Sequence, residues 1–312
     1  MTIHEQIYNL NRNPELSEWF HNQLSSHIAF GLYPNDIQPV ADGLIDQLSA
    51  YRTAHGKDTV AVGISGGVDS AVTAALFKEA GYRVIGTLMP IYQKPEETER
   101  GQELCDALGI ESEVRDLTQT FNAVFDQFST FDSTLSRPGH EAMVRGGNLR
   151  ARLRMMTLYD IAGANRGFVA STDNFSELAA GFWTLHGDVG DVSPIQSLTK
   201  SWEVPRLAQH LNIPDSIVRA VPTDGLGISN SDEDQFGFSY LEFDIGLFTL
   251  IRQEFLDISE LENRDFAIMQ EIRKRISGTT FKRNNPYNLD HPIHGTRYTD
   301  LEKLDTQLQL GK

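Results

Sequence analysis

The segment Ser65–Ser70 reads Ser-Gly-Gly-Val-Asp-Ser and lies between an apolar run and a helical pattern. A strand that ends in Gly-Gly and turns directly into a helix points several backbone N–H groups, and the positive end of the helix, at one place, which favours an anion. The hydroxyls of Ser65 and Ser70 add donors, and Asp69 could hold a divalent cation against bound phosphates. The segment matches neither G-x-x-x-x-G-K-[ST] nor G-x-G-x-x-G. A tight turn that uses glycine only for its small size is the alternative.

Apolar patterns around this segment indicate strands that alternate with helices. Thr59–Ile64 is typical of a buried strand, and the residues after Asp69 follow a helical pattern that ends at Gly81. Such alternation predicts an α/β fold with a doubly wound, mostly parallel sheet and helices on both faces. We expect further strands at Arg83–Met89, Ser112–Leu117 and Gly167–Thr172, and further helices at Glu96–Leu108, Asn148–Ala164, Lys200–Leu211, Pro214–Ala220, Tyr240–Phe255 and Ser259–Ile276.

We predict a single domain over residues 1–312, because no obvious linker divides the chain. Its parts are a helical N-terminal extension at 1–58, an α/β core at 59–237 and a helical C-terminal part at 238–312. In the extension, apolar residues at helical spacing fall near one face: Ile37, Val40, Leu44, Leu48 and Tyr51.

Two long segments show no packing pattern. Pro222–Gly237 and Gly278–Tyr298 are polar, aperiodic and interrupted by glycine or proline. Loops of this length in compact proteins are usually functional or disordered. We expect them to be lids over the carboxyl edge of the sheet, and loops that are merely mobile are the alternative.

Composition excludes several classes of partner and site. The formal net charge is −16, which argues against nucleic acid as the main partner, because phosphate backbones are held by Lys and Arg. The single cysteine, Cys105, excludes an internal disulfide and a multi-cysteine zinc site, and we expect it to be a buried apolar residue on a helix. The chain shows neither a signal-peptide pattern nor an apolar stretch of membrane-spanning length. We expect a cytoplasmic protein without membrane contact.

Ser65–Ser70 resembles the pyrophosphate-binding loop (PP-loop) of ATP pyrophosphatases, which split ATP into AMP and pyrophosphate while activating an acceptor oxygen. Four later motifs resemble one family of that group, the ammonia-dependent NAD synthetases. Their order and spacing follow that family from about Val60 to Asn285. The motifs are GNLRARLRM, STDNFSELAAGFWTLHGD, DVSPIQSLTKSWEVPRLAQHL, and PTDGL followed by SDEDQFGFSY.

The resemblance implies a fold like that of the adenine nucleotide alpha hydrolases, a homodimer and a C–N ligase reaction. The nicotinate carboxylate of deamido-NAD would attack the α-phosphate of ATP to give an acyl-adenylate and pyrophosphate. Ammonia would then displace AMP to give NAD. A carboxylate is a poor acyl donor and adenylation supplies a good leaving group, so the protein would contribute mainly positioning and charge stabilisation.

The resemblance assigns Asp69, Glu177 and Lys200 to catalysis. Asp69 and Glu177 match ligands of Mg²⁺, and Lys200 matches a lysine that neutralises phosphate charge. Taken alone, Glu177 could be a helix-surface glutamate and Lys200 a solvated residue at a helix start. The residues assigned to ATP are Gly63, Ile64, Ser65, Gly66, Gly67, Val68, Asp69, Ser70, Thr172, Lys200 and Thr223.

The resemblance assigns the acceptor substrate to a second set: Arg152, Asp191, Leu185, Phe281 and Lys282. Arg152 lies among Arg145, Arg150 and Arg154, where a solvated helix face is the alternative, and on a helix Arg150 and Arg154 share a face that Arg152 does not.

The chain departs from the family at three places, all on the acceptor side. Leu185 stands where a lysine is common, Phe281 where a histidine is common, and the turn GDVGDVSP is one residue shorter. Nicotinate mononucleotide is therefore an alternative acceptor, since it would tolerate lost contacts to the adenylate half of the dinucleotide.

We expect free ammonia, or ammonia from a separate protein, as the nitrogen source, because we recognise no glutaminase module in the sequence. Cys105 also lies within a predicted helix of the α/β unit, the wrong place for a glutaminase nucleophile. Two other functions stay open. A tRNA-modifying ATP pyrophosphatase conflicts with the acidic charge and single thiol, and a non-catalytic nucleotide-binding protein conflicts with the presence of Asp69, Glu177 and Lys200 together.

Overall fold

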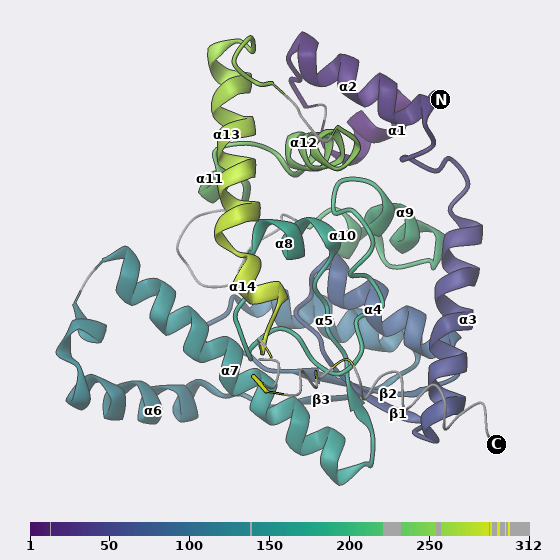
Figure 1. Cartoon of the computed structure of the whole chain (residues 1–312). Helices are drawn as coiled ribbons and strands as arrows, with labels where there is room; N and C mark the ends of the chain where they lie inside the picture. Colours follow the sequence, from purple (N-terminus) through teal and green to yellow (C-terminus); the bar gives the residue numbers. More distant parts are fainter. Residues whose placement is uncertain are drawn as a thin grey trace.

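The computed structural model contains a four-stranded sheet in the order β3-β2-β1-β4 (Figure 1). Each neighbouring pair of strands is parallel, with Val60 opposite both Val84 of β2 and Phe168 of β4. The predicted parallel, doubly wound sheet is therefore confirmed. The strands are β1 (Thr59–Gly63), β2 (Arg83–Leu88), β3 (Glu111–Val114) and β4 (Phe168–Val169).

Helices cover both faces of this sheet, as the alternating side chains of β1 show. Val60 and Val62 pack in one apolar core with α3, α4, α5 and α9, whereas Ala61 faces a second core formed with α7. A strand sends successive side chains to opposite faces, so a largely apolar strand is buried on both sides. The sheet is thus a rigid platform between two helical layers.

The helices extend over much of the chain. The structure describes residues 1–299 except 13, 138, 221–231, 254–256, 287, 289–291, 294–296 and 298. The helices before β4 are α1 (Ile3–Leu10), α2 (Glu18–Ala29), α3 (Gln38–His55), α4 (Val68–Glu79), α5 (Pro95–Leu108), α6 (Thr118–Phe131), the 3-10 helix η1 (Ser133–Ser136) and α7 (His140–Ala164). Those after β4 are α8 (Phe175–Ala180), α9 (Glu203–His210), α10 (Asp215–Val218), α11 (Asp232–Phe236), α12 (Tyr240–Arg252), α13 (Asn263–Gly278) and α14 (Thr280–Arg283).

Several predicted boundaries were wrong. Strand β4 is shorter than predicted, because after Val169 the chain makes only a single bridge, between Ala170 and Val192. Helix α7 begins at His140, eight residues before the predicted start, and α9 begins only at Glu203. The stretch Gly278–Tyr298 is not uniformly irregular, since α14 lies within it.

A further apolar core joins the two ends of the chain. Ile7, Phe20 and Leu24 of the N-terminal helices pack with residues of α12 and α13, and Figure 1 shows these helices together at the top of the molecule. In α3, Leu48 is buried, and Val40, Leu44 and Tyr51 pack against the sheet core, as the predicted apolar face requires. Within the described residues, none of the helices has the length and apolar content that a bilayer crossing needs.

Candidate active site

The segment between β1 and α4 forms a loop beside a pocket at the carboxyl end of β1. Gly66 has a φ of +80°, and a Cβ built there would lie 2.3 Å from the carbonyl oxygen of Glu97. Glycine is the residue that suits both this conformation and this close approach. Helix α4 begins directly after Gly67, and its first-turn N–H groups have no partner within the helix. With the helix dipole, they make the loop suitable for a phosphate chain.

The two predicted serines shape this loop. Ser65 Oγ lies 3.1 Å from Ser70 Oγ and accepts a hydrogen bond of 3.2 Å from the backbone N–H of Gly67. Ser70 Oγ donates to the carbonyl of Gly67 at 3.0 Å, and Ser70 is only 2% exposed. Ser70 therefore lies behind the loop, outside the pocket lining.

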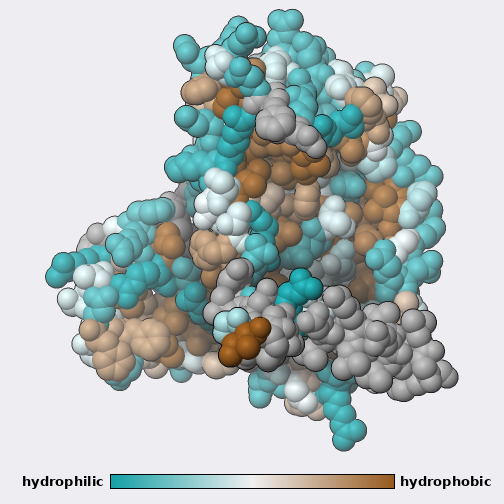
Figure 2. Space-filling model, in the orientation of Figure 1, coloured by the Kyte–Doolittle hydropathy of each residue, from teal (hydrophilic) through white to brown (hydrophobic). Residues whose placement is uncertain are grey.

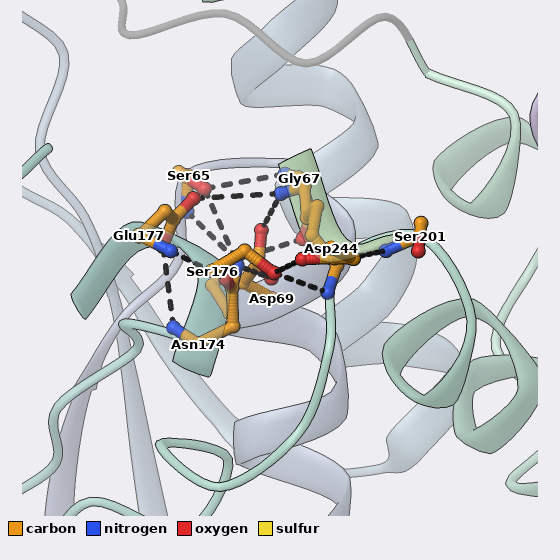
Figure 3. A network of polar contacts seen from close by, with 10 residues as sticks. Ser65, Gly67, Asp69, Asn174, Ser176, Glu177, Ser201 and Asp244 are labelled. Carbon is orange, nitrogen blue, oxygen red and sulfur yellow. Dashed lines mark hydrogen bonds and ion pairs between the residues drawn. The ribbon is translucent and has the colours of Figure 1, made fainter. Parts of the chain in front are cut away.

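Asp69, Glu177 and Lys200 come together from three parts of the chain. Lys200 Nζ forms an ion pair with Asp69 and lies 3.6 Å from Glu177 Oε1. The Lys200 side chain is 8% exposed, so it is not the solvated lysine of the alternative reading. Asn174 connects the carboxylates, because its side chain donates to Asp69 at 3.0 Å and accepts from the backbone N–H of Glu177 at 3.0 Å (Figure 3).

Helix capping positions Glu177. Asn174 is the N-cap of α8, and the Glu177 carboxylate accepts from the backbone N–H of Asn174 at 3.2 Å, which completes a capping box. The Glu177 side chain is 15% exposed and faces the pocket, so the interpretation as a surface glutamate is wrong. One local motif thus starts α8 and aims a carboxylate at Asp69.

Negative charge accumulates at this place. Burial raises the pKa of Glu177 well above its ordinary value, and the charge of Asp69 raises it further, whereas Lys200 lowers it. Burial also raises the pKa of Asp173 well above its ordinary value, followed by the charges of Asp188 and Asp69. Asp173 Oδ2 has no hydrogen-bond partner among the described residues. Carboxylates that repel one another in a poorly solvated site favour a bound cation.

These oxygen ligands suit magnesium. Mg²⁺ is usually held by one or two carboxylates together with substrate phosphates rather than by a cage of protein ligands. Asp69 and Glu177 supply two carboxylates next to the phosphate loop, and the described residues contain no group of three or more His, Cys, Asp or Glu side chains that could hold a metal alone. The donor set fits an ion that is shared with a nucleotide.

The structure brings most of the predicted ATP residues to one pocket. The whole stretch from Gly63 to Asp69 lines it, together with Thr172, Glu177 and Lys200. Thr223 lies outside the described residues. Each of these assignments to ATP stays a prediction. Because the residues line one pocket, a single bound nucleotide could contact all of them.

The predicted acceptor residues lie outside this pocket lining, and three of them gather next to one another. Arg152 is exposed and its Nε donates to the carbonyl of Leu185 at 3.2 Å. Lys282 of α14 donates to the carbonyls of Gly181, at 2.6 Å, and Trp183, at 2.5 Å. The segment 181–185 thus holds these cations.

Phe281 is the neighbour of Lys282 on α14, whereas Asp191 is tied to β4 and α7. Phe281 is 59% exposed. The carboxylate of Asp191 accepts from the backbone N–H of Val169 and the hydroxyl of Tyr159, both at 2.9 Å. The Asp191 carboxylate therefore already ties its segment to α7 and β4, and a contact with the acceptor substrate would come in addition to these two bonds.

Sequence reasoning missed Arg154. It lines the pocket, donates from Nε to the carbonyl of Met89 at 3.0 Å, and has a nitrogen, Nη2, without a partner among the described residues. Burial lowers the pKa of Arg154 to about 10, with a further contribution from Arg150. A buried guanidinium nitrogen next to a phosphate loop suits an anionic ligand. Helical spacing could have found it, because Arg154 shares the buried side of α7 with Leu158, one turn later.

The assembled site can activate a phosphoanhydride. Backbone N–H groups, Lys200 and Arg154 could bind the phosphates, and Asp69 with Glu177 could bind a cation on them. Helices α4, α7 and α8 carry Asp69, Arg154 and Glu177, so these groups are in place before a ligand arrives, which is the condition for electrostatic stabilisation of a transition state. The candidate active site is therefore a phosphoryl- or nucleotidyl-transfer site with an adjoining acceptor region.

Comparisons with known proteins agree with this geometry. The model of the NAD synthase family matches residues 40–286. The chain is 33% identical over 243 residues, 77% of its length, to the NH(3)-dependent NAD(+) synthetase of Alkaliphilus oremlandii, and covers 93% of that protein. Among solved structures, it is similar to an NMN synthetase from Francisella tularensis with a TM-score of 0.68, 28% identity, and coverage of 80% of this chain and 96% of the other. The NH3-dependent NAD synthetase from Campylobacter jejuni gives a TM-score of 0.65, 28% identity, and coverage of 82% and 100%.

Proposed function

This chain belongs to the NAD synthase family, and on that premise we propose that it amidates the nicotinate carboxylate of deamido-NAD with ammonia, at the expense of ATP. The products are NAD, AMP and pyrophosphate. The observation that carries the proposal is the convergence of Asp69, Glu177 and Lys200 at the end of the phosphate loop. The protein is thus a ligase that forms a C–N bond.

In the first step a carboxylate oxygen of the acceptor attacks the α-phosphorus of ATP. The bond from that phosphorus to the β-phosphate oxygen breaks, and pyrophosphate leaves on the side of Ser65–Ser70. Lys200 and Arg154 lie where they would offset the charge of the phosphates, and the loop amides would hold pyrophosphate. When bound, Mg²⁺ would neutralise phosphate charge, and Asp69 and Glu177 are the residues that would hold it.

In the second step ammonia attacks the carbonyl carbon of the acyl-adenylate. The bond from this carbon to the AMP oxygen breaks, AMP leaves with the bonding electrons, and the nitrogen gives up a proton to form the amide. The protein contributes alignment of the two reactants and exclusion of water. Ammonia as the donor is supported by the similarity to relatives named NH(3)-dependent, of which the chain spans nearly the whole length.

A second acceptor, nicotinate mononucleotide, is favoured by one observation. Leu185, whose carbonyl accepts from Arg152, stands where the resemblance to the family implies a lysine, so a donor for a distal phosphate or ribose would be lost on this side. The similarity to a protein named NMN synthetase gives this alternative a precedent of the same fold. The first step and the ATP residues are the same for both acceptors.

One assay tests the proposal. The purified protein is incubated with ATP, Mg²⁺ and ammonium, with either deamido-NAD or nicotinate mononucleotide, and AMP and the amidated product are measured. We expect equal amounts of AMP and amide with the preferred acceptor, and little product when glutamine replaces ammonium. Absence of amide with both acceptors would refute the proposed function, and comparable turnover with glutamine would refute the nitrogen source.

We propose a homodimer as the working form, supported by an apolar surface on the projecting pair α6 and α7. Phe128, Phe131, Met143 and Met156 are 46%, 75%, 41% and 62% exposed. Figure 2 shows apolar side chains along the lower edge of this projection. Exposed apolar patches of this kind mark association surfaces. Sedimentation should give twice the chain mass, and Phe131→Asp should shift it towards the monomer.

We also propose a cytoplasmic location. Cys105 is a free, buried thiol, which is typical of proteins from a reducing compartment. Fractionation of cells that produce the untagged chain would test this, with recovery in the membrane fraction as the contradicting result.

A further inference from the structure

Helix α12 carries a buried carboxylate, that of Asp244, which connects the segment of Glu177 with the segment of Lys200. Asp244 is 0% exposed. Its Oδ1 accepts from the hydroxyl of Ser176 at 2.5 Å, and its Oδ2 accepts from the backbone N–H of Ser201 at 3.0 Å. Figure 3 shows the Asp244 carboxylate between these two residues. Asp244 itself is absent from the residues that line the pocket.

The same hydroxyl also holds the backbone of the catalytic lysine. Ser176 Oγ accepts from the backbone N–H of Lys200 at 3.0 Å while it donates to Asp244. The N–H groups of two consecutive residues, Lys200 and Ser201, therefore depend on one carboxylate, the first through Ser176 and the second directly. Ser176 precedes Glu177 in α8, so this carboxylate also holds the first turn of the helix that carries Glu177.

Lys200 needs such support because it stands outside regular structure. Helix α9 begins only at Glu203, so the segment around Lys200 is a turn whose N–H groups are not held by a helical ladder. A buried lysine loses side-chain freedom and solvation, and its position must be set by surrounding contacts. The bonds to Ser176 and Asp244 supply those contacts at the backbone.

A stability role alone does not account for Asp244. Burial raises the pKa of Asp244 to about 6, and hydrogen bonds from Ser176 and Ser201 oppose this shift. The carboxylate is therefore ionised at neutral pH in a site that disfavours its charge, and buried charges commonly contribute little to net stability. The direct effect of Asp244 is that its hydrogen bonds hold Ser176 and the backbone of Ser201 in place.

We propose that Asp244 is a positioning residue that holds Lys200 against Asp69 and Glu177 through the backbone of residues 200 and 201. The inference rests on the proposed function, since it assigns Lys200 to the ATP phosphates. Asp244 does not line the pocket, so its action would pass through Ser176 and Ser201.

The substitution Asp244→Asn tests this role with almost no change of volume. The asparagine has one acceptor and one donor group where the aspartate has two acceptors. If the asparagine oxygen faces Ser201, its NH2 group faces Ser176, and the Ser176 hydroxyl has lost its acceptor. In the other orientation the NH2 group faces the backbone N–H of Ser201, so two donors meet. We expect kcat/KM for ATP to fall at least roughly tenfold, because a small displacement of a group that stabilises charge is enough for such a loss.

A double-mutant comparison separates positioning from general damage. Lys200→Gln is combined with Asp244→Asn, and ATP affinity is measured by calorimetry alongside kcat/KM. If Asp244 acts through Lys200, the double variant should be no worse than Lys200→Gln alone. Losses that multiply, or an Asp244→Asn enzyme with wild-type kcat/KM and ATP affinity, would overturn the proposal.

Glu242→Gln is the matched control. Glu242 is also a buried acid of α12, 3% exposed, but its carboxylate accepts from the backbone N–H and the hydroxyl of Ser239 and pairs with Arg264. We expect it to lower the melting temperature while kcat/KM stays within about twofold of wild type. An equal loss of kcat/KM in both variants would show that any buried change in α12 is sufficient, and would overturn the assignment.

Two further measurements keep the test decisive. If Asp244→Asn does not fold, Ser176→Ala removes the link to the Lys200 N–H while Asp244 stays in place, and the same loss and the same dependence on Lys200 are expected. If the wild type produces no amide with either acceptor, the proposed function fails, whereas the calorimetric comparison of ATP affinities still decides the role of Asp244.

Discussion

Lys200 Nζ lies 3.6 Å from Glu177 Oε1, and 8% of the lysine side chain is exposed. The same ammonium group pairs with Asp69, so it occupies the space between the two carboxylates that are proposed to hold Mg²⁺. A cation on ATP and the ammonium group of Lys200 must therefore share these two carboxylates.

The first prediction concerns this shared site. Asp69→Asn removes one charge and keeps the shape, so we expect most of the turnover to be lost while the fold survives. Activity is measured against Mg²⁺ concentration, and folding by circular dichroism. Glu79→Gln, at the far end of the same helix, is the control and should leave both unchanged. An Asp69→Asn enzyme with near-normal turnover at ordinary Mg²⁺ would end the metal assignment.

The second prediction uses two arginines that lie two residues apart on α7. Arg154→Met should raise KM for ATP roughly tenfold, because a buried charge-assisted contact is lost from the pocket. Arg152→Met should leave KM for ATP nearly unchanged and raise KM for the acceptor, since Arg152 lies at Leu185. Steady-state kinetics with each substrate varied would separate the two, and the reverse pattern would exchange their roles.

The third prediction concerns acceptor choice. The double variant Leu185→Lys and Phe281→His should shift the ratio of kcat/KM between deamido-NAD and nicotinate mononucleotide, because both residues lie outside the lining of the nucleotide pocket. KM for ATP should stay constant. If instead KM for ATP changes and the acceptor ratio does not, these residues belong to the nucleotide side.

The fourth prediction concerns Cys105. The residue is 0% exposed, and burial raises its thiol pKa to about 11. Since the thiolate is the reactive form, the native protein should resist alkylation at pH 7.5 and take up one label per chain in denaturant. Cys105→Ala should keep full activity and lose on the order of 1 kcal/mol of unfolding free energy. Loss of activity on labelling of the native protein would contradict this view.

The fifth prediction concerns stability and pH. Burial raises the pKa of Asp244 from its ordinary value of 3.8 to about 6, so the folded protein binds this proton more tightly than the unfolded chain does. The stability gained from that proton is fully present below pH 3.8 and is lost as the pH rises through 6. Between pH 5 and pH 8 the unfolding free energy of the wild type should fall by about 1 kcal/mol relative to Asp244→Asn. Urea unfolding of both proteins at the two pH values measures the difference, and a pH-independent difference would contradict the raised pKa.

The phosphate loop and the order of strands and helices could be predicted from the sequence, because both depend on neighbouring residues. A strand, two glycines and a helix start determine where the amides of Ser65–Ser70 lie, and alternating apolar runs determine a parallel sheet. Cys105 was likewise predictable as a buried helical residue, and the structure confirms it. Where local signals were weak, at the start of α7 and at α14, the predicted boundaries were wrong.

The meeting of Asp69, Glu177 and Lys200 was decided only by the tertiary structure. Lys200 meets Asp69 across 131 positions of the chain, and Asp244 reaches Ser176 across 68. Family resemblance named Lys200, but neither resemblance nor periodicity indicated Asp244. Helical spacing could indicate the side of α7 that carries Arg154, but not the pocket that Arg154 lines. Contacts between distant segments depend on how whole helices pack on the sheet, and that packing is a property of the complete core rather than of any local stretch of sequence.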